Sequence, residues 1–244
     1  LAIGLNFIDT YHRSGLYPLK LPSGLGMEGA GVVEEIGSDV KSFSIGDNIA
    51  YASPPLGSYS DERNIPANIA VKIPDGISHK ISASIMTKGL TVHYLLFKTY
   101  KVSAGETILF HAAAGGVGQI FCQWAKSLGC KVIGTVGSES KIETAKKNGC
   151  DFVINYNKES FDKKVLEITN NKGLSVVYDG VGGGYAEAAA RALGIQKADR
   201  GPPGTGRVRR GSCPSPRKKQ AEGTGRELGG CASATRDGRQ AAMA

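Results

Sequence analysis

A run of small residues between an apolar strand and a helix is the part of this sequence best suited to binding a ligand. Within Thr107-Ile-Leu-Phe-His-Ala-Ala-Ala-Gly-Gly-Val-Gly118, residues Ala113, Gly115 and Gly118 have the spacing of the dinucleotide fingerprint, with alanine at the first position. Small residues let the backbone approach a pyrophosphate, and the N-terminus of the following helix offers free N–H groups and a positive dipole end. A tight turn packed for its own sake is the alternative. The flanking strand and helix favour a dinucleotide site.

The choice between NAD and NADP is made at the tip of the second strand, about 20 residues further along the chain. NAD sites place a carboxylate there for the ribose 2′-hydroxyl, but this sequence has Gly137-Ser-Glu-Ser-Lys141. Neither Gly137 nor Ser138 is acidic, and Lys141 can meet a 2′-phosphate as a point charge. Glu139 could still turn inward, and a single lysine in a first helical turn is usually only solvated. Together with Tyr156 after the third strand, the missing acid favours NADP.

Strands that alternate with helices are expected to position this turn. The expected strands cover 107–110, 131–136, 152–154 and 174–178, with helices over 116–128, 140–148 and 160–169 between them. This alternation indicates a parallel, doubly wound α/β sheet. The first helix is the clearest, because its apolar residues from Val117 to Leu128 recur at helical spacing on one face. Gly129 then follows where a helix C-cap belongs.

The first part of the chain has a different texture. Short segments rich in Val, Ile and Tyr, separated by Gly, Pro, Asn and Asp, predict strands over 30–36, 48–52, 58–65 and 69–73. From Ser78 to Tyr100 the sequence becomes helical. We therefore divide the chain into a β domain over 1–94, a dinucleotide-binding domain over 95–183 and a tail over 184–244.

The formal net charge of +8 on the 244 residues is concentrated in the tail. Residues 1–183 carry 18 basic and 17 acidic side chains, whereas residues 184–244 carry 12 basic and five acidic ones. Because the tail has so few large apolar residues, most of it is expected to be disordered, with helix-forming composition over 185–193 as an exception. Two interpretations compete. The tail is either a basic arm that binds nucleic acid or sequence joined from a foreign source, since its Gly, Arg, Ala and Pro replace the Lys, Asn and Ile of the body.

The cysteines argue against a disulfide scaffold and against a thiolate zinc cage. Five are scattered along the chain without a C-x-x-C pair, so a reducing compartment, and with it a cytoplasmic location, is expected. The uncharged stretch Thr107–Ala125 is long enough for a membrane helix, but its histidine, two glutamines and three glycines fit a strand, a turn and a helix better. No membrane span is expected.

Seven separate motifs resemble those of a single protein family. They are Asn6-Phe-Ile-Asp-Thr-Tyr11, Arg13-Ser-Gly-Leu-Tyr-Pro18, Leu25-Gly-Met-Glu-Gly-Ala-Gly31, Lys88-Gly-Leu-Thr-Val92, His111-Ala-Ala-Ala-Gly-Gly-Val-Gly118, Gly134-Thr-Val-Gly137 and Val177-Tyr-Asp179. From Leu1 to about Gly183 the chain resembles the quinone oxidoreductases, the zinc-free, zeta-crystallin-like branch of the medium-chain dehydrogenase/reductase superfamily. The resemblance implies a partial chaperonin-10-like catalytic domain, a partial Rossmann domain and NADPH in the cleft between them.

The resemblance also implies roles for individual residues. Asn6, Phe7 and Tyr11 would lie beside the nicotinamide and the quinone pocket. The other implied cofactor contacts are Thr91 on the hinge helix, Gly115, Gly116, Val117 and Gly118 at the pyrophosphate, Gly137, Ser138, Lys141 and Tyr156 around the adenosine phosphate, and Val181 within 180–182 near the ribose. No zinc is expected, because Asn6 and Met27 occupy the places of zinc ligands in the alcohol dehydrogenases, and amide and thioether are poor zinc ligands.

Three functions follow from these observations. The first is NADPH-dependent reduction of quinones by hydride transfer, or of enones, which the same family accepts; hydride addition to a quinone gives a delocalised anion. The second is a non-catalytic nucleotide-binding or RNA-associating protein dominated by its basic tail. The third is an inactive truncated product. The resemblance implies that the start of the first domain precedes Leu1, and that the tail replaces the rest of the Rossmann sheet with the edge that forms the family's homodimer.

Overall fold

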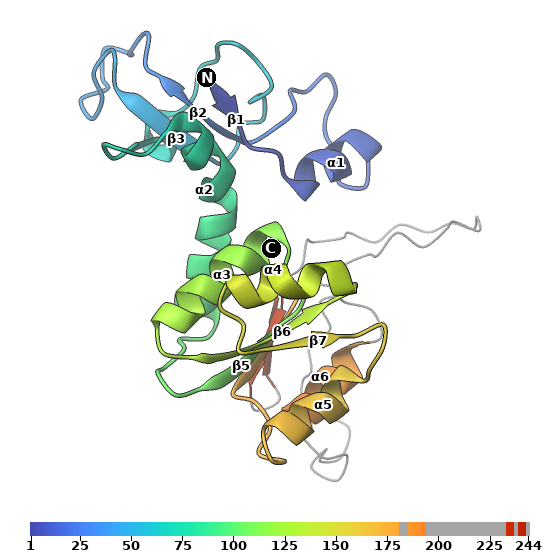
Figure 1. Ribbon diagram of the computed structural model, residues 1–244. Coiled ribbons are helices and arrows are strands. Elements are labelled where there is room, and N and C mark those ends of the chain that lie inside the picture. Colours follow the sequence, from blue (N-terminus) through green and yellow to red (C-terminus); the bar gives the residue numbers. More distant parts are fainter. Residues whose placement is uncertain (181–184, 194–232, 237–238, 243–244) are drawn as a thin grey trace, which may run out of the picture. The chain divides into compact units, whose positions relative to one another are not determined.

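The computed structural model describes residues 1–180, 185–193, 233–236 and 239–242. They fall into two compact units, one over Leu1–Leu90 and one that begins at Thr91. The helix α2 (His79–His93) begins in the first unit and ends in the second (Figure 1). The domain boundary expected after residue 94 stays a prediction. Within the described residues, no helix combines the length and the apolar content that crossing a membrane requires.

The first unit is built on a four-stranded antiparallel sheet. Its strands, in spatial order, are β1 (Ala2–Ile3), β2 (Glu28–Val32), β3 (Asn48–Ala52) and β4 (Val71–Lys72). A small core of buried alanines joins this sheet to the helix: Ala30 comes from β2, Ala50 from β3 and Ala83 from α2. Because these side chains are small, α2 packs closely on the sheet.

Three of the strands expected in the first unit differ from the structure. The strand expected over 30–36 is β2, which begins earlier, at Glu28, and ends at Val32. Residues 58–65 form a loop, in which the guanidinium of Arg63 donates hydrogen bonds to Pro55 O (2.7 Å) and Ser58 Oγ (3.2 Å). These local bonds replace a strand ladder. The strand expected over 69–73 shortens to β4, because a 3₁₀ turn over Ala67–Ile69 follows Pro66.

The helix α1 (Phe7–Ser14) has no counterpart in the sequence-based expectation, because a segment of eight residues is shorter than the window over which a helical period can be recognised. Its two ends explain it. At the N-terminus, the backbone N–H of Asn6 donates to Asp9 Oδ2 (3.0 Å), which satisfies one helix-end donor. At the C-terminus, Gly15 takes the left-handed conformation (φ +73°) that ends a helix. This helix contains the predicted site residues Phe7 and Tyr11, and a third, Asn6, is its N-cap residue.

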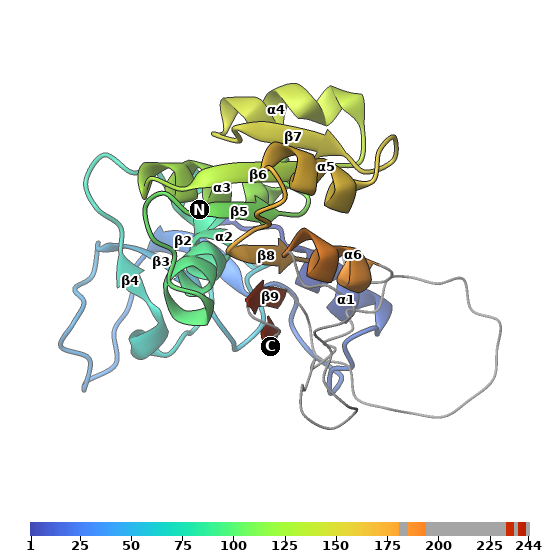
Figure 2. The ribbon, with the colours of Figure 1, turned by 90° about the horizontal axis from the view of Figure 1, so that it is seen from below.

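The second unit is a doubly wound parallel sheet, as predicted. The strands β5 (Thr107–Phe110), β6 (Lys131–Val136), β7 (Phe152–Asn155) and β8 (Val176–Asp179) run parallel in the order β8-β5-β6-β7. The helices α3 (Gly116–Ser127) and α4 (Ile142–Lys147) cover one face of this sheet, and α5 (Phe161–Ile168) and α6 (Tyr185–Ala192) cover the other (Figure 1; Figure 2). Gly129 follows α3 with φ +82°, the C-cap conformation expected there.

Alternate residues of the strands supply two separate cores. On β5, Ile108 and Phe110 join the core beneath α3, whereas Leu109 joins the core beneath α5 and α6. The first core is rich in aromatic rings: Phe121 lies 4.2 Å from Phe110 and 4.7 Å from Tyr178 between ring centroids. Because helices cover both faces, the strands are apolar along their whole length rather than at every second residue.

The described part of the tail is folded, which differs from the disorder expected for most of 184–244. Besides α6, the tail contributes β9 (Ser233–Arg236), which pairs antiparallel with β8, and β10 (Arg239–Ala242), which pairs with β9. The edge of β8 presents backbone donors and acceptors that a polar segment can satisfy as well as an apolar one. The expectation for 194–232 lies outside the described residues, and so does the predicted site residue Val181.

Candidate functional site

The glycine turn at the carboxyl end of β5 has the tight packing that its small residues predict. Ala113 N donates to Thr135 O of β6 (3.0 Å), which ties the turn to the neighbouring strand. A Cβ atom on Gly118 would lie 2.5 Å from Ala113 O and 2.6 Å from Ala112 O. Real Cβ atoms do not come so close to backbone oxygens. Gly118 therefore allows the first turn of α3 to pack directly on the strand–helix turn.

The N-terminus of α3 has the features of an anion site. The helix begins at Gly116, and its N-cap residue Gly115 supplies no side-chain hydrogen bond. The first backbone N–H groups of the helix, among them those of Gly116 and Val117, therefore have no partner within the helix and point along its positive dipole end. Both glycines are exposed. These residues fit the pyrophosphate of a dinucleotide.

A second group of predicted residues gathers at the ends of β6 and β7. Gly137 follows β6 directly, and a Cβ there would lie 2.5 Å from the hydroxyl oxygen of Tyr156, which follows β7. Asn157 Nδ2 donates to Gly137 O (2.7 Å) and ties the two strand ends together. Ser138 and Lys141 come next, before and within the 3₁₀ turn Glu139–Lys141. The structure thus brings Gly137, Ser138 and Tyr156 to the edge where adenosine binds in this type of sheet.

The charges at this edge favour an anion. Glu139, the acid that could have turned inward, lies 2.7 Å from the ammonium of Lys158 in an exposed ion pair. Lys141 is exposed, and among the described residues no carboxylate forms an ion pair with it. A phosphate at this point would meet an unneutralised cation. Because Glu139 is paired with Lys158, the ammonium of Lys141 is the charge left to meet a phosphate at this edge, and its role there stays a prediction.

His111 begins the glycine turn and gives the second unit a titratable group in its interior. Its ring is 2% exposed, Nδ1 lies 2.8 Å from Thr135 Oγ1, and the ring of Phe161 packs edge-on at 4.7 Å. Burial lowers the pKa of His111 below its usual value, although the carboxylate of Asp179 acts in the opposite direction. The folded chain therefore keeps this imidazole neutral at pH values where the unfolded chain protonates it.

Lowering the pH below about 6.5 should destabilise the second unit, since only the unfolded chain then takes up the His111 proton. Stability is fully present above that pH, and the loss approaches about 1.4 kcal/mol per pH unit below it. Urea unfolding between pH 5 and pH 8, followed by the fluorescence of Trp124, measures the effect. His111→Asn keeps a polar partner for Thr135 and should flatten the profile. Equal pH profiles for the two proteins would contradict this assignment.

In the first unit, Asn6 lies in a buried polar network. Its amide Nδ2 donates to Glu28 Oε2 (2.5 Å), and its Oδ1 accepts a hydrogen bond from Lys88 Nζ (3.2 Å). The carboxylate of Glu28 is fully buried and also accepts the backbone N–H of Thr87 (2.8 Å). Lys88 Nζ lies 3.9 Å from Glu28 Oε2. A buried carboxylate requires such partners, because burying an unpaired charge costs several kcal/mol.

The other predicted residues of this region lie close to Asn6 in the chain. Phe7 is 80% exposed, and its ring stacks at 6.4 Å on the half-buried ring of Tyr11, the next turn of α1. The structure therefore places Asn6, Phe7 and Tyr11 together as an amide beside an exposed aromatic surface. Thr91 lies on the part of α2 that belongs to the second unit. The roles of these residues at a nicotinamide or a quinone stay predictions.

The sequence reasoning gave no role to Glu28, Thr87 or Lys88. Glu28 could have been found, because it stands alone among the small and apolar residues of Leu25–Gly31, and a charge within a buried strand must have a partner. Nothing local in the sequence identifies Lys88 as that partner.

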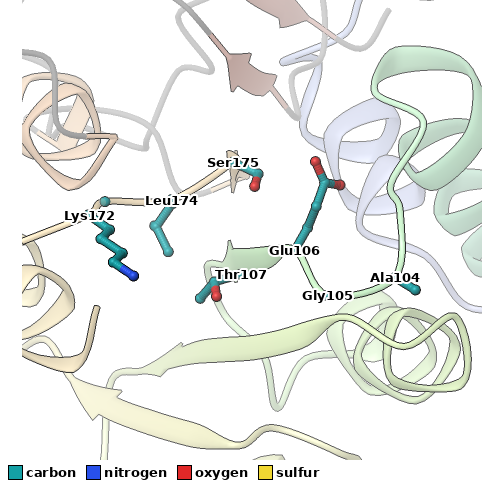
Figure 3. Close-up of a pocket in the computed structure, with 8 residues that line it drawn as sticks. Ala104, Gly105, Glu106, Thr107, Lys172, Leu174 and Ser175 are labelled. Carbon is teal, nitrogen blue, oxygen red and sulfur yellow. The ribbon is translucent and has the colours of Figure 1, made fainter. Parts of the chain in front are cut away.

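A hollow elsewhere in the second unit does not belong to the site. It measures about 500 Å³ and is lined by residues 104–107 and 172–175, at the amino ends of β5 and β8 (Figure 3). Ligands of open α/β sheets bind outside the carboxyl ends of the strands, where the glycine turn lies. The one carboxylate in the hollow, that of Glu106, already accepts hydrogen bonds from Tyr100 Oη (2.5 Å) and Ser103 N (2.8 Å).

Comparisons with known proteins agree with this architecture. Residues 1–75 match the alcohol dehydrogenase GroES-like domain, and residues 116–196 match the zinc-binding dehydrogenase domain. The chain is 56% identical over 182 residues to a quinone oxidoreductase of Pseudomonas aeruginosa, covering 74% of this chain and 56% of that protein. It is 48% identical over 187 residues to a 2-haloacrylate reductase of Burkholderia sp, covering 74% and 56%. The crystal structure of the Escherichia coli quinone oxidoreductase complexed with NADPH gives a TM-score of 0.76 at 53% identity, covering 79% of this chain and 59% of that one.

A GroES-like unit followed by a Rossmann-type sheet with a glycine turn defines a medium-chain dehydrogenase/reductase. Within that superfamily the chain belongs to the quinone oxidoreductase family. The chain spans slightly more than half the length of the curated relatives that it matches.

The name of the second domain raises the question of zinc, and the residues present do not fit it. Among the described residues, no three His, Cys, Asp or Glu side chains gather into a group that could hold a metal. Around Glu28, the neighbours are the amide of Asn6 and the ammonium of Lys88. Zinc prefers thiolate, imidazole and carboxylate ligands, and the Lys88 cation would repel it. No step of the reaction is assigned to zinc.

Proposed function

We propose that this chain carries the residues of an NADPH-dependent quinone reductase. The proposal depends on one observation: Gly118 packs closely against the carbonyl oxygens of Ala112 and Ala113, at the N-terminus of α3, where no side chain caps the helix. This packing leaves backbone N–H groups of the first turn available to a pyrophosphate. The 56% identity to a protein named quinone oxidoreductase supports the choice of acceptor.

Each group of residues has a separate task in this proposal. The first-turn N–H groups of Gly116 and Val117 would bind the pyrophosphate, and the edge formed by Gly137, Ser138 and Tyr156 would hold the adenosine end. When bound, NADPH supplies the hydride that reduces the quinone. The amide of Asn6 would hydrogen-bond a carbonyl oxygen of the acceptor, and the rings of Phe7 and Tyr11 would contact its apolar face. Thr91 and Val181 complete the proposed cofactor contacts.

Replacing Lys141 with glutamate should weaken NADPH much more than NADH. A charge-assisted hydrogen bond contributes about 1.5–3 kcal/mol, so the Kd of NADPH should rise about 10- to 100-fold, whereas NADH has no 2′-phosphate to lose. Nicotinamide fluorescence titration with both cofactors measures the ratio. Lys146→Glu, on the exposed side of the adjoining helix α4, makes the same charge change and is the control. Equal losses of NADPH and NADH affinity in Lys141→Glu would remove the basis for NADP selectivity.

Acceptor class is tested by NADPH consumption with 1,4-benzoquinone and, separately, with 2-chloroacrylate. The quinone oxidoreductase of Pseudomonas aeruginosa is 56% identical to this chain and the 2-haloacrylate reductase is 48% identical, so we expect turnover with the quinone. Turnover with 2-chloroacrylate alone would mean that the acceptor is an activated carbon–carbon double bond and not a quinone. NADPH binding without turnover of either acceptor would contradict the proposed enzyme activity.

Three further expectations depend on the family or the tail. Cytoplasmic residence is supported by the free, buried thiols of Cys122, Cys130 and Cys150, which need no oxidising compartment. The homodimer of the family and nucleic-acid binding by the tail stay predictions. Light scattering measures the first, and salt-sensitive retention on RNA that is lost on removing residues 184–244 measures the second.

A further inference from the structure

The proposed function gives no role to Lys88. Its ammonium nevertheless contacts Asn6, the residue whose amide is proposed to hydrogen-bond the acceptor. Lys88 Nζ lies 3.2 Å from Asn6 Oδ1 and 3.9 Å from Glu28 Oε2, and the Lys88 side chain is 23% exposed. We infer that Lys88 is a positioning residue, which together with Glu28 fixes the orientation of the Asn6 amide. This inference rests on the proposed function only for the identity of the acceptor.

The chemistry of the two neighbours allows one amide orientation. A carboxylate only accepts hydrogen bonds and an ammonium only donates them, so Nδ2 of Asn6 must face Glu28 and Oδ1 must face Lys88. Turning the amide over would set two acceptors against each other at Glu28 and two donors against each other at Lys88. Without Lys88, only the Glu28 contact would distinguish the two orientations.

The fixed amide leaves one donor for a ligand. One N–H of Nδ2 is used by Glu28, and the other hydrogen bond of Nδ2, to Thr87 Oγ1 at 3.5 Å, is at the outer limit of a hydrogen bond. That second N–H can serve a carbonyl oxygen that gains negative charge as hydride is added. A donor held in place before the reaction stabilises such charge better than one that must turn into place.

Lys88 also neutralises the network. Glu28 is fully buried, and Lys88 is the one cation that forms an ion pair with it among the described residues. Removing Lys88 therefore leaves a buried charge without a counter-ion, so a loss of activity could reflect a loss of folding. A test must separate the effect of Lys88 on the orientation of the Asn6 amide from its effect on the stability of the first unit.

The test compares the full chain with Lys88→Met, Lys88→Arg and the double variant Glu28→Gln/Lys88→Met. The double variant removes both charges together. It therefore leaves no unpaired buried charge, which is the feature that could unfold Lys88→Met. Lys80→Met, on an exposed position of the same helix, is the matched control. Thermal melts establish that each variant is folded.

The first readout is the side-chain amide signal of Asn6 in ¹⁵N NMR, assigned by its absence in Asn6→Asp. We expect one sharp pair of NH₂ signals in the wild-type chain, in Lys88→Arg and in Lys80→Met. We expect broadened or doubled signals in Lys88→Met and in the double variant. An unchanged Asn6 signal in both of these would overturn the inference.

The second readout is turnover of 1,4-benzoquinone. Lys88→Met should lower kcat about 10- to 100-fold, the scale of a misplaced reacting group, while the Kd of NADPH changes less than about twofold. Lys88→Arg should recover most of the loss. Unchanged kcat in Lys88→Met would also overturn the inference. If the wild-type chain itself turns over no acceptor, the proposed function fails, and the NMR measurement still decides the role of Lys88.

Discussion

Gly118→Ala should abolish measurable NADPH binding, although it adds a single methyl group. The added Cβ would meet Ala113 O at 2.5 Å and Ala112 O at 2.6 Å, and both are backbone atoms that cannot rotate away. Either the glycine turn or the first turn of α3 must shift, and the N–H groups proposed to bind the pyrophosphate shift with it. We expect the Kd of NADPH to rise by about 100-fold or more, and the free energy of unfolding to fall by about 1–3 kcal/mol.

Fluorescence titration with NADPH and urea unfolding measure both effects of Gly118→Ala. The control is Gly89→Ala, because this helical glycine has open space where a Cβ would lie. There the same methyl group should leave NADPH affinity within about twofold and stabilise the helix by about 0.5–1 kcal/mol. Wild-type affinity in Gly118→Ala would show that the turn tolerates a Cβ and that the steric argument is wrong.

Glu28→Leu should destabilise the first unit by about 3–5 kcal/mol. The substitution removes the acceptor of the Thr87 N–H and of the Asn6 amide, and it leaves the Lys88 cation without its counter-ion. The unit can offset little of this loss, because its core consists mainly of the small side chains of Ala30, Ala50 and Ala83.

Hydrogen exchange of the β2 amides is the measurement for Glu28→Leu, because it reports opening of the first unit directly. The only tryptophan of the chain, Trp124, lies on α3 in the second unit, so its fluorescence provides an internal control. Glu28→Gln keeps the side-chain shape and one acceptor oxygen, and it should cost less than Glu28→Leu. Unchanged exchange in Glu28→Leu would mean that the buried network contributes nothing to stability.

The second unit was predictable because its signals are local. Each of its strands is a short apolar run, each helix that follows it has a helical period or caps, and the glycine turn is continuous in sequence. The first unit carries weaker local signals. The β-favouring residues of 58–65 are overridden by the hydrogen bonds of Arg63, and α1 depends on contacts at its two ends, Asn6–Asp9 and Gly15.

The candidate site divides in the same way. The residues predicted to bind the pyrophosphate and the adenosine lie in the segments that follow β5, β6 and β7, so their spacing in the sequence suffices to predict them. The network around Asn6 joins three segments that are distant in sequence: Glu28 is 22 residues from Asn6, and Lys88 is 82 residues from it. No local pattern encodes such a contact. The tertiary structure alone shows that the Asn6 amide has a cation on one side and a carboxylate on the other.

The strand order of the second unit has a consequence for how the chain folds while the ribosome synthesises it. β5 is the first strand of this unit to be made, and in the sheet it lies between β6 and β8. β6 is made soon after β5. β8, whose Val176 pairs with Ile108 of β5, is made only after β6 and β7. Until Asp179 has been synthesised, one long side of β5, with the apolar Ile108 and Leu109, has no neighbour. An unpaired apolar edge invites association with other nascent chains. The interval between synthesis of Asn155 and Asp179 is therefore a stage at which a chaperone would protect the growing chain.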